Sequence, residues 1–179
     1  MTEPFTKHSE KVIHDNGFFR ILERVYRLPN GKEHRYFIQD EVDSCCVLAR
    51  TTEGKFIAVQ EFRVGPEQVM TELPAGRLEG RSDNPDRRIK QELLEETGYL
   101  GVLKKVGVLP SSPYSNKWIH CYYAIDCKKV GLQRLDANEF IEVKLFSKEE
   151  MYEILISGKS SSCSPGLLAW EWMRRDATL

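Results

Sequence analysis

The sequence predicts an α+β sandwich, in which many short strands are combined with a few amphipathic helices. Two patterns predict it: apolar residues alternate along short runs bounded by Gly or Asn, and apolar residues at helical spacing begin only after residue 84. The chain has 179 residues, of which 41% are hydrophobic. A chain of this size can bury a sizeable core without disulfides or a structural metal, so one compact domain is expected.

The first third of the chain is typical of antiparallel hairpins. Asn30-Gly31 supplies the positive φ angles that a tight turn requires, and Gly54 provides a second turn. The strands that these turns join are expected at Phe18–Arg27 with Glu33–Ile38, and at Cys45–Arg50 with Lys55–Phe62. One hairpin is therefore expected to lead the chain, and a second to follow it.

Helix signals occur at three places further along. Asn84 is a suitable N-cap, apolar residues recur at helical spacing behind it, and Gly98 ends the pattern. Ser147 and Glu150 form a capping box, and a last helix is expected from Ser164. Between these helices, further strands are expected at Leu103–Leu109, Trp118–Asp126 and Phe140–Phe146.

Charge and composition limit the partners that the chain can have. Its 26 Lys and Arg residues against 27 Asp and Glu argue against a general nucleic-acid or membrane-surface binder, and leave a small anionic ligand possible. The polar segment Met1–Ser9 lacks the apolar core of a signal peptide, and no run approaches the roughly 20 apolar residues that span a bilayer. Five cysteines without metal-binding spacing are expected to be reduced thiols, so a cytoplasmic location is predicted.

Three glutamates stand out in the first expected helix. Glu92, Glu95 and Glu96 are at positions i, i+3 and i+4, which share one helix face. Like charges at this spacing cost a few tenths of a kcal/mol per pair. A hard divalent cation such as Mg²⁺, which prefers oxygen ligands and is commonly shared with substrate phosphates, would offset this cost. The spacing alone is more typical of a solvated acidic face, so the surrounding residues must decide between the two interpretations.

Those surroundings resemble the Nudix box. The box pattern is Gly, five residues, Glu, seven residues, then Arg-Glu-apolar-any-Glu-Glu-any-Gly-apolar. Here the segment Glu72–Gly76, expected to be a loop, supplies the first glycine, and Glu92–Tyr99 matches the end of the box. The resemblance implies a Nudix-type α/β/α sandwich with a mixed sheet over residues 41–179. It also implies an N-terminal antiparallel hairpin extension over residues 1–40.

The sequence departs from the box at three points. One extra residue follows Gly76, Asp83 stands at the position of the first box glutamate, and Gln91 stands where the family has Arg. The family's Arg pairs with the glutamates and orients them, whereas Gln91 can only hydrogen-bond. Either Lys90 or Arg88 is a possible substitute for the missing guanidinium.

The resemblance also implies residue roles. Glu92 and Glu96 are the expected metal ligands, Glu95 a further ligand or a group that orients the attacking water, and Ala75 a ligand through its carbonyl oxygen. The expected cofactor is Mg²⁺, with Mn²⁺ as the alternative. The implied chemistry is attack of water on a phosphorus atom, with the metal lowering the pKa of the water and neutralising charge on the pyrophosphate.

Residues outside the box indicate the substrate. The segment Gln60–Arg63, followed by Glu72, resembles the region ahead of the box in ADP-ribose and nucleoside diphosphate sugar pyrophosphatases, where the Arg and the Glu contact substrate. Arg63 offers a planar fork that matches phosphate or stacks on a base, and Glu72 can accept hydrogen bonds from ribose hydroxyls or an adenine amine. At Ser111–Asn116, where those enzymes have a Ser-Pro-Gly loop, this chain has a Tyr in place of Gly. Tyr114 is therefore expected to stack on a base or sugar and Lys117 to bind a phosphate, unless the segment is an ordinary turn.

The general base is expected in a later acidic loop. The segment Leu135–Val143 resembles the family's mobile loop, in which a glutamate deprotonates the attacking water. Glu139 is the first candidate, so that Glu95, Glu139 and Glu92 form the expected catalytic set, and Asp136 is the second. Loop closure would bring such a base within reach of the water.

The resulting hypothesis is hydrolysis of a nucleoside diphosphate sugar to a nucleoside monophosphate and a sugar phosphate. A hydrolase of nucleoside triphosphates or dinucleotides is the second possibility. A nucleotide-binding regulator with little activity is the third, and Gln91 and Asp83 favour it. By the same resemblance, the hairpin Phe18–Ile38 is expected to pair two subunits into a homodimer.

Overall fold

The computed structural model describes residues 3–179 and contains two compact units. The first unit consists of the chain up to Asp43 together with Pro110–Trp118, and the second of Ser44–Leu109 together with Ile119–Leu179. None of the helices formed by residues 3–179 is long and apolar enough to cross a membrane.

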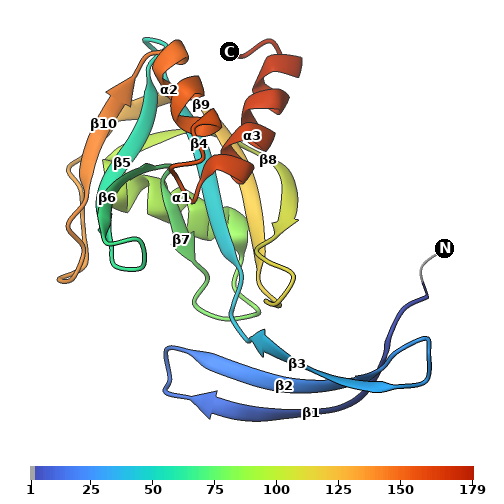
Figure 1. The fold of residues 1–179 in the computed structure, drawn as a ribbon. Coiled ribbons are helices and arrows are strands. Elements are labelled where there is room, and N and C mark those ends of the chain that lie inside the picture. Colours follow the sequence, from blue (N-terminus) through green and yellow to red (C-terminus); the bar gives the residue numbers. More distant parts are fainter. Residues whose placement is uncertain (1–2) are drawn as a thin grey trace. The chain divides into compact units, whose positions relative to one another are not determined.

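The first unit is a three-stranded antiparallel sheet in the order β1-β2-β3 (Figure 1). Its strands are β1 (Thr6–Asp15), β2 (Arg20–Arg27) and β3 (Glu33–Gln39). The predicted hairpin is confirmed as β2 and β3, with the amide of Leu28 donating to the carbonyl of Lys32 at 2.8 Å and Gly31 at φ 79°. β1 was not predicted, because all ten of its residues are exposed and its sequence has no burial pattern.

The second unit is built on a mixed sheet in the order β10-β5-β4-β9-β8, with β6 added to β5 and β7 to β4. β4 and β9 run parallel, whereas β5 is antiparallel to β4, β6 and β10. The strands are β4 (Ser44–Thr51), β5 (Phe56–Arg63), β6 (Gln68–Glu72), β7 (Ala75–Arg77), β8 (Tyr99–Pro110), β9 (Trp118–Lys129) and β10 (Glu142–Phe146). The predicted mixed sheet is confirmed. β7 replaces part of the expected loop, because it pairs with the first residues of β4.

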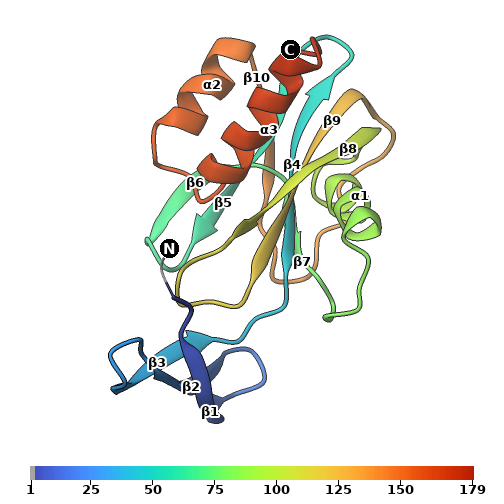
Figure 2. The same cartoon turned by 90° about the vertical axis from the view of Figure 1, so that its right-hand side faces the viewer.

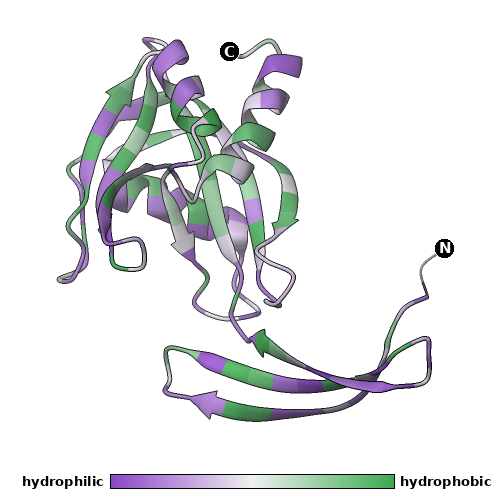
Figure 3. Ribbon diagram, viewed as in Figure 1, coloured by the Kyte–Doolittle hydropathy of each residue, from purple (hydrophilic) through white to green (hydrophobic). Residues whose placement is uncertain are grey.

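Helices cover both faces of this sheet: α1 (Pro85–Thr97) on one side, α2 (Lys148–Ile156) and α3 (Cys163–Arg175) on the other (Figure 2). Successive residues of β4 divide between two cores. Val47 packs with Leu93 of α1, whereas Leu48 packs with Met151 of α2 and Trp170 of α3. β5 accordingly begins with four buried hydrophobic residues, Phe56–Val59, whereas hydropathy alternates along β10 (Figure 3). The predicted α/β/α sandwich is confirmed.

The ends of α1 follow from local chemistry. The side chain of Asn84 accepts hydrogen bonds from the amides of Asp86 and Arg87, at 2.9 and 3.2 Å, as an N-cap should. Gly98 adopts the left-handed conformation at φ 77° and donates its amide to the carbonyl of Leu94. The predicted limits of the helix are therefore confirmed, and so is the capping box of α2.

Candidate active site

Two of the three glutamates lie on the buried face of α1. Ile89, Glu92, Leu93 and Glu96 are at helical spacing, and the two apolar residues are fully buried in the core under the sheet. Glu92 and Glu96 are only 6% and 8% exposed, whereas Glu95 is half-buried. A solvated acidic face would point away from the core, so this arrangement has a different purpose.

The carboxylate of Glu92 lies directly against Gly76 of β7. A Cβ atom added at Gly76 would overlap the carboxylate carbon and an oxygen of Glu92. β7 is held in place by antiparallel pairing with β4, in which Gly76 is opposite Cys45. The first glycine of the motif is therefore needed because the glutamate approaches its backbone so closely.

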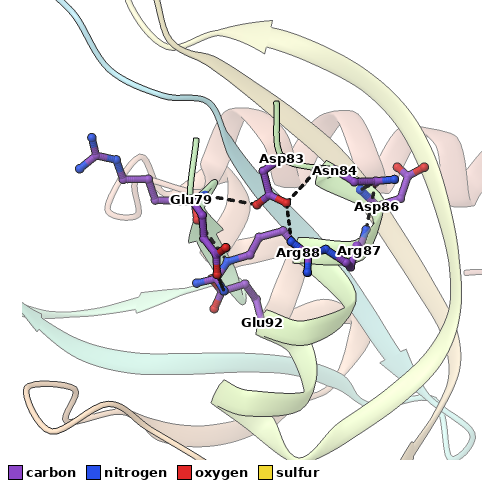
Figure 4. Close-up of polar contacts among 8 residues, drawn as sticks. Glu79, Asp83, Asn84, Asp86, Arg87, Arg88 and Glu92 are labelled. Atoms are coloured by element: carbon purple, nitrogen blue, oxygen red, sulfur yellow. Dashed lines mark hydrogen bonds and ion pairs between the residues drawn. The ribbon is translucent and has the colours of Figure 1, made fainter. Parts of the chain in front are cut away.

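Arg88 holds Glu92 from one helical turn earlier. Its Nη2 lies 2.6 Å from Oε1 of Glu92, and its Nε donates to the carbonyl of Arg77 at 3.2 Å (Figure 4). A weaker ion pair of 3.8 Å joins it to Glu79. Of the two basic residues that could replace the family's Arg, Arg88 makes this contact, whereas Lys90 is exposed.

Asp83 shapes the loop that leads into α1. Its carboxylate accepts hydrogen bonds from the amides of Glu79 and Asn84, at 3.2 and 2.7 Å, and from the guanidinium of Arg87 at 2.7 Å (Figure 4). Both of its oxygens are thus used within this segment.

Glu96 meets the backbone of the residue expected to supply a carbonyl ligand. Oε2 of Glu96 accepts a hydrogen bond from the amide of Ala75 at 3.1 Å. The first residue of β7 and the last turn of α1 are therefore in direct contact.

The pKa values of these carboxyls reflect their burial first and the neighbouring negative charges second. Burial first, and then the charge of Glu92, raise the pKa of Glu96 to about 9, although the hydrogen bond from the amide of Ala75 opposes the shift. Burial also raises the pKa of Glu92 to about 7, with Arg88 lowering it and both Glu95 and Glu139 raising it. Glu139 is therefore near enough to act on both buried carboxyls. A divalent cation would stabilise such a cluster in its ionised form.

The donor set suits a hard cation, although it is not arranged around one. Among the described residues, no three His, Cys, Asp or Glu side chains are gathered closely enough to hold a metal ion. Glu92 is turned to Arg88 and Glu96 to the amide of Ala75. Carboxylate and carbonyl oxygens are nevertheless the ligands that Mg²⁺ and Mn²⁺ prefer. A bound cation would also offset the cost of ionising the two buried carboxyls, whose pKa values are raised mainly by burial.

Arg63, at the end of β5, is fixed between two carboxylates. Its Nε donates to Oε2 of Glu72 at 2.6 Å, and its Nη1 lies 2.9 Å from Oε2 of Glu61. Glu72 is only 2% exposed, and its other oxygen accepts hydrogen bonds from the amide and the hydroxyl of Ser161. Glu72 was expected to bind substrate, and in this structure both of its oxygens are engaged by the protein.

Sequence reasoning missed two members of this group. Burial raises the pKa of Glu61, with Arg63 lowering it and Glu72 and Glu139 raising it, so Glu61 belongs to the same acidic surroundings. Glu61 lies inside Gln60–Arg63, the segment that resembles nucleoside diphosphate sugar pyrophosphatases. A charged residue on a largely buried strand was a signal that could have marked it as a site residue. No local signal could have found Ser161, which is separated from Glu72 by 89 residues.

The loop that bears Glu139 is attached to the end of α1. The amide of Gln133 donates from Nε2 to the carbonyl of Glu96 at 2.7 Å, and the backbone amide of Arg134 donates to the carbonyl of Glu95 at 2.8 Å. Within the loop, the amide of Asp136 donates to Oε2 of Glu139 at 2.9 Å. Glu139 is half-buried and Asp136 is exposed.

Tyr114 and Lys117 belong to the first compact unit. The carbonyl of Tyr114 accepts the amide of Gln39 at 2.8 Å, and Nζ of Lys117 lies 3.6 Å from Glu41. Tyr114 is 58% exposed. It lines a cavity of about 240 Å³ together with the aromatic side chains of Phe5, Tyr26 and Tyr36.

In this α/β/α sandwich, the buried glutamates of α1 lie against the short strand that contains Gly76. This arrangement fits the class of pyrophosphohydrolases that the sequence resembles, and comparison with known proteins supports the same class. The model of the NUDIX domain matches residues 40–162. The chain belongs to the Nudix family.

Three relatives of similar sequence have different named functions. An ADP-ribose pyrophosphatase of Bacillus subtilis is 35% identical over 133 residues, covering 73% of this chain and 71% of the relative. A methanol dehydrogenase activator of Bacillus methanolicus is 30% identical, covering 72% and 70%. A GDP-mannose pyrophosphatase of Salmonella typhimurium is 27% identical, covering 89% and 90%.

A solved structure confirms the fold. The crystal structure of an ADP compounds hydrolase superposes with a TM-score of 0.83 over 100% of this chain and 99% of that chain, at 16% sequence identity. An identity this low supports the architecture alone.

Proposed function

We propose that this protein hydrolyses the pyrophosphate bond of a nucleoside diphosphate sugar, giving a nucleoside monophosphate and a sugar phosphate. The observation that carries the proposal is the presence, in one compact unit, of buried glutamates on α1 and of an arginine pinned by Glu72. A guanidinium is well suited to bind phosphate oxygens. Two relatives are named for ADP-ribose and GDP-mannose, which are both nucleoside diphosphate sugars.

The carboxylates of Glu92, Glu95 and Glu96 and the carbonyl of Ala75 are the groups proposed to hold a divalent cation, Mg²⁺ in first place and Mn²⁺ as the alternative. Bound there, the cation would lower the pKa of the attacking water and neutralise charge on the pyrophosphate oxygens. Glu95, which is half-buried, is proposed either to ligate the cation or to orient the water.

The remaining roles follow from position. Glu139 is the proposed general base, because its charge acts on both buried carboxyls from a loop tied to α1. Arg63 is the proposed phosphate contact in the second unit. In the first unit, Tyr114 is proposed to stack on a base or sugar of the substrate, and Lys117 is proposed to bind a phosphate.

We also propose a cytoplasmic homodimer. The three-stranded sheet of the first unit and the segments beside it expose apolar side chains that a second copy could cover: Phe5, Val12, Ile13, Phe18 and Phe37 are each at least 45% exposed. All five cysteines are free thiols, which suits a reducing compartment. Light scattering of the purified chain would measure its mass in solution, and a monomer would exclude the dimer.

The decisive experiment is a substrate panel. The protein would be incubated with Mg²⁺ or Mn²⁺ and ADP-ribose, GDP-mannose, other nucleotide sugars, dinucleotides and nucleoside triphosphates, and the products identified by chromatography. Release of a nucleoside monophosphate and a sugar phosphate is expected. Cleavage of triphosphates alone would overturn the proposed substrate class, and tight nucleotide binding without turnover would indicate a regulator instead.

A further inference from the structure

Three consecutive serines, Ser160–Ser162, form the last part of the connection between α2 and α3, and two of them hydrogen-bond at the end of β6. The amide of Ser161 donates to Oε1 of Glu72 at 3.2 Å, and its hydroxyl donates to the same oxygen. The hydroxyl of Ser162 accepts the amide of Leu73 at 3.2 Å. This segment thus fixes both a buried side chain and the backbone next to it.

The contact with Glu72 matters because a buried carboxylate needs partners for both oxygens. Arg63 donates two groups, Nε and Nη2, to a single oxygen, Oε2. The other oxygen has Ser161 as its partner. The orientation of the carboxylate plane, and through it the direction of the guanidinium, therefore depends on Ser161.

Ser161 is also at the surface of the space that Arg63 faces. Arg63, Glu72 and Ser161 line one cavity of about 470 Å³ between the β5–β6 turn and the α2–α3 connection. The side chain of Arg63 is 42% exposed although Glu72 beside it is buried. The guanidinium is thus held rigidly from the protein side and remains accessible to a ligand.

We infer that Ser161 is a positioning residue, which orients Arg63 through Glu72 for contact with the diphosphate of the substrate. This inference rests on the proposed function, because it takes Arg63 as a phosphate contact. It assigns a role in substrate binding to the connection between α2 and α3.

The first test compares three variants by steady-state kinetics on the nucleotide sugar that the panel identifies. Ser161→Ala is expected to raise KM about tenfold while kcat changes little, since the loss of a binding contact acts on KM. Ser161→Thr retains the hydroxyl and is expected to restore KM to within about twofold. Ser164→Ala, at an exposed serine of the first turn of α3, is the matched control and is expected to have normal kinetics.

A double-mutant cycle separates positioning from a general structural effect. If Ser161 acts through Arg63, then Ser161→Ala should add nothing to the KM of Arg63→Ala. Additive effects, or a normal KM in Ser161→Ala, would overturn the inference. Thermal unfolding reports on the fold of each variant, and Ser161→Cys, which keeps a weaker donor, replaces Ser161→Ala if the latter does not fold.

Calorimetric binding of ADP distinguishes this inference from the proposed function, because it needs no turnover. If ADP binds and Ser161→Ala weakens that binding about tenfold, the inference stands even where no nucleotide sugar is cleaved. If the sugar is cleaved and both ADP binding and KM are unchanged in Ser161→Ala, the inference fails and the proposed function stands. If the protein neither binds ADP nor cleaves the sugar, both fail.

Discussion

Nη2 of Arg88 lies 2.6 Å from Oε1 of Glu92, which is four residues, or about one turn, further along α1. This ion pair supplies a guanidinium to Glu92 even though Gln91 occupies the position at which the family has Arg. Helix geometry explains the choice, because residues four apart share a face, whereas residues two apart, such as Lys90 and Glu92, do not.

Removal of Arg88 is therefore expected to weaken cation binding. Groups that orient a ligand commonly contribute about 10- to 100-fold to metal affinity, so a loss in that range is expected for Arg88→Ala. Calorimetric titration with Mn²⁺ would measure it. Lys90→Ala, a loss of the same charge two residues away, is the control and should bind normally. Tighter binding by Arg88→Ala would show instead that Arg88 competes with the cation for Glu92.

The raised pKa of Glu96 predicts how stability depends on pH. The folded protein keeps the Glu96 proton up to about pH 9, whereas the unfolded chain loses it near 4.5. Because the folded state binds more protons between these values, its stability falls as pH rises through this window. In EDTA, the Tm is expected to fall as the pH is raised from about 5 to about 9. Glu96→Gln should remove much of this dependence of Tm on pH.

Added Mg²⁺ provides the matching test of Glu96. The cation stabilises the ionised carboxylate, so at high pH Mg²⁺ should raise the Tm of the natural protein and leave that of Glu96→Gln nearly unchanged. An equal rise of Tm in both proteins would show that Mg²⁺ acts elsewhere.

Glu139 is expected to affect turnover rather than binding. A general base typically contributes about 10²- to 10⁴-fold, so Glu139→Gln should lower kcat within this range and leave KM nearly unchanged. Asp136→Asn is the control in the same loop. This substitution removes a carboxylate but keeps the backbone amide of residue 136, which donates to Oε2 of Glu139. If Asp136→Asn is the variant that loses turnover, the assignment of the two residues is reversed.

Local signals predicted the parts of the fold that depend on local chemistry. Asn84 begins α1 through its own side chain, and Gly98 ends α1 through its own left-handed φ angle. Both effects are local, so the sequence alone could predict them. β1 escaped prediction because it is exposed along its whole length, so that no alternation of apolar residues marks it. β7 escaped because three residues are too few to show a period.

The site was predictable to the extent that its residues lie within one motif. Glu92 and Glu96 could be identified from their spacing, and their burial was also readable, because Ile89 and Leu93 precede them by three residues and share their helix face. Their contacts with Ala75 and Gly76 of β7 were not readable, because no local pattern marks so short a strand. Ser161 could not be identified at all, because its role depends on a contact made only when the connection between α2 and α3 folds back to the end of β6.

Gly76 gives the sharpest test of the site, because a single methyl group should separate function from fold. Gly76 is not among the residues with positive φ, so alanine introduces no backbone strain there. The added Cβ would overlap the carboxylate of Glu92, which is the far end of a flexible side chain and can move away. Gly76→Ala is therefore expected to fold with a Tm close to normal while losing most of its cation affinity and activity.

The control for this prediction is Gly80→Ala, in the loop between β7 and α1. A Cβ at Gly80 meets no other atom within 4 Å, so this variant should retain both cation binding and turnover. Calorimetry with Mn²⁺ and a rate assay on the same samples would compare the two variants. Full activity in Gly76→Ala would mean that Glu92 works equally well away from β7, and its assignment as a metal ligand beside Ala75 would have to be abandoned.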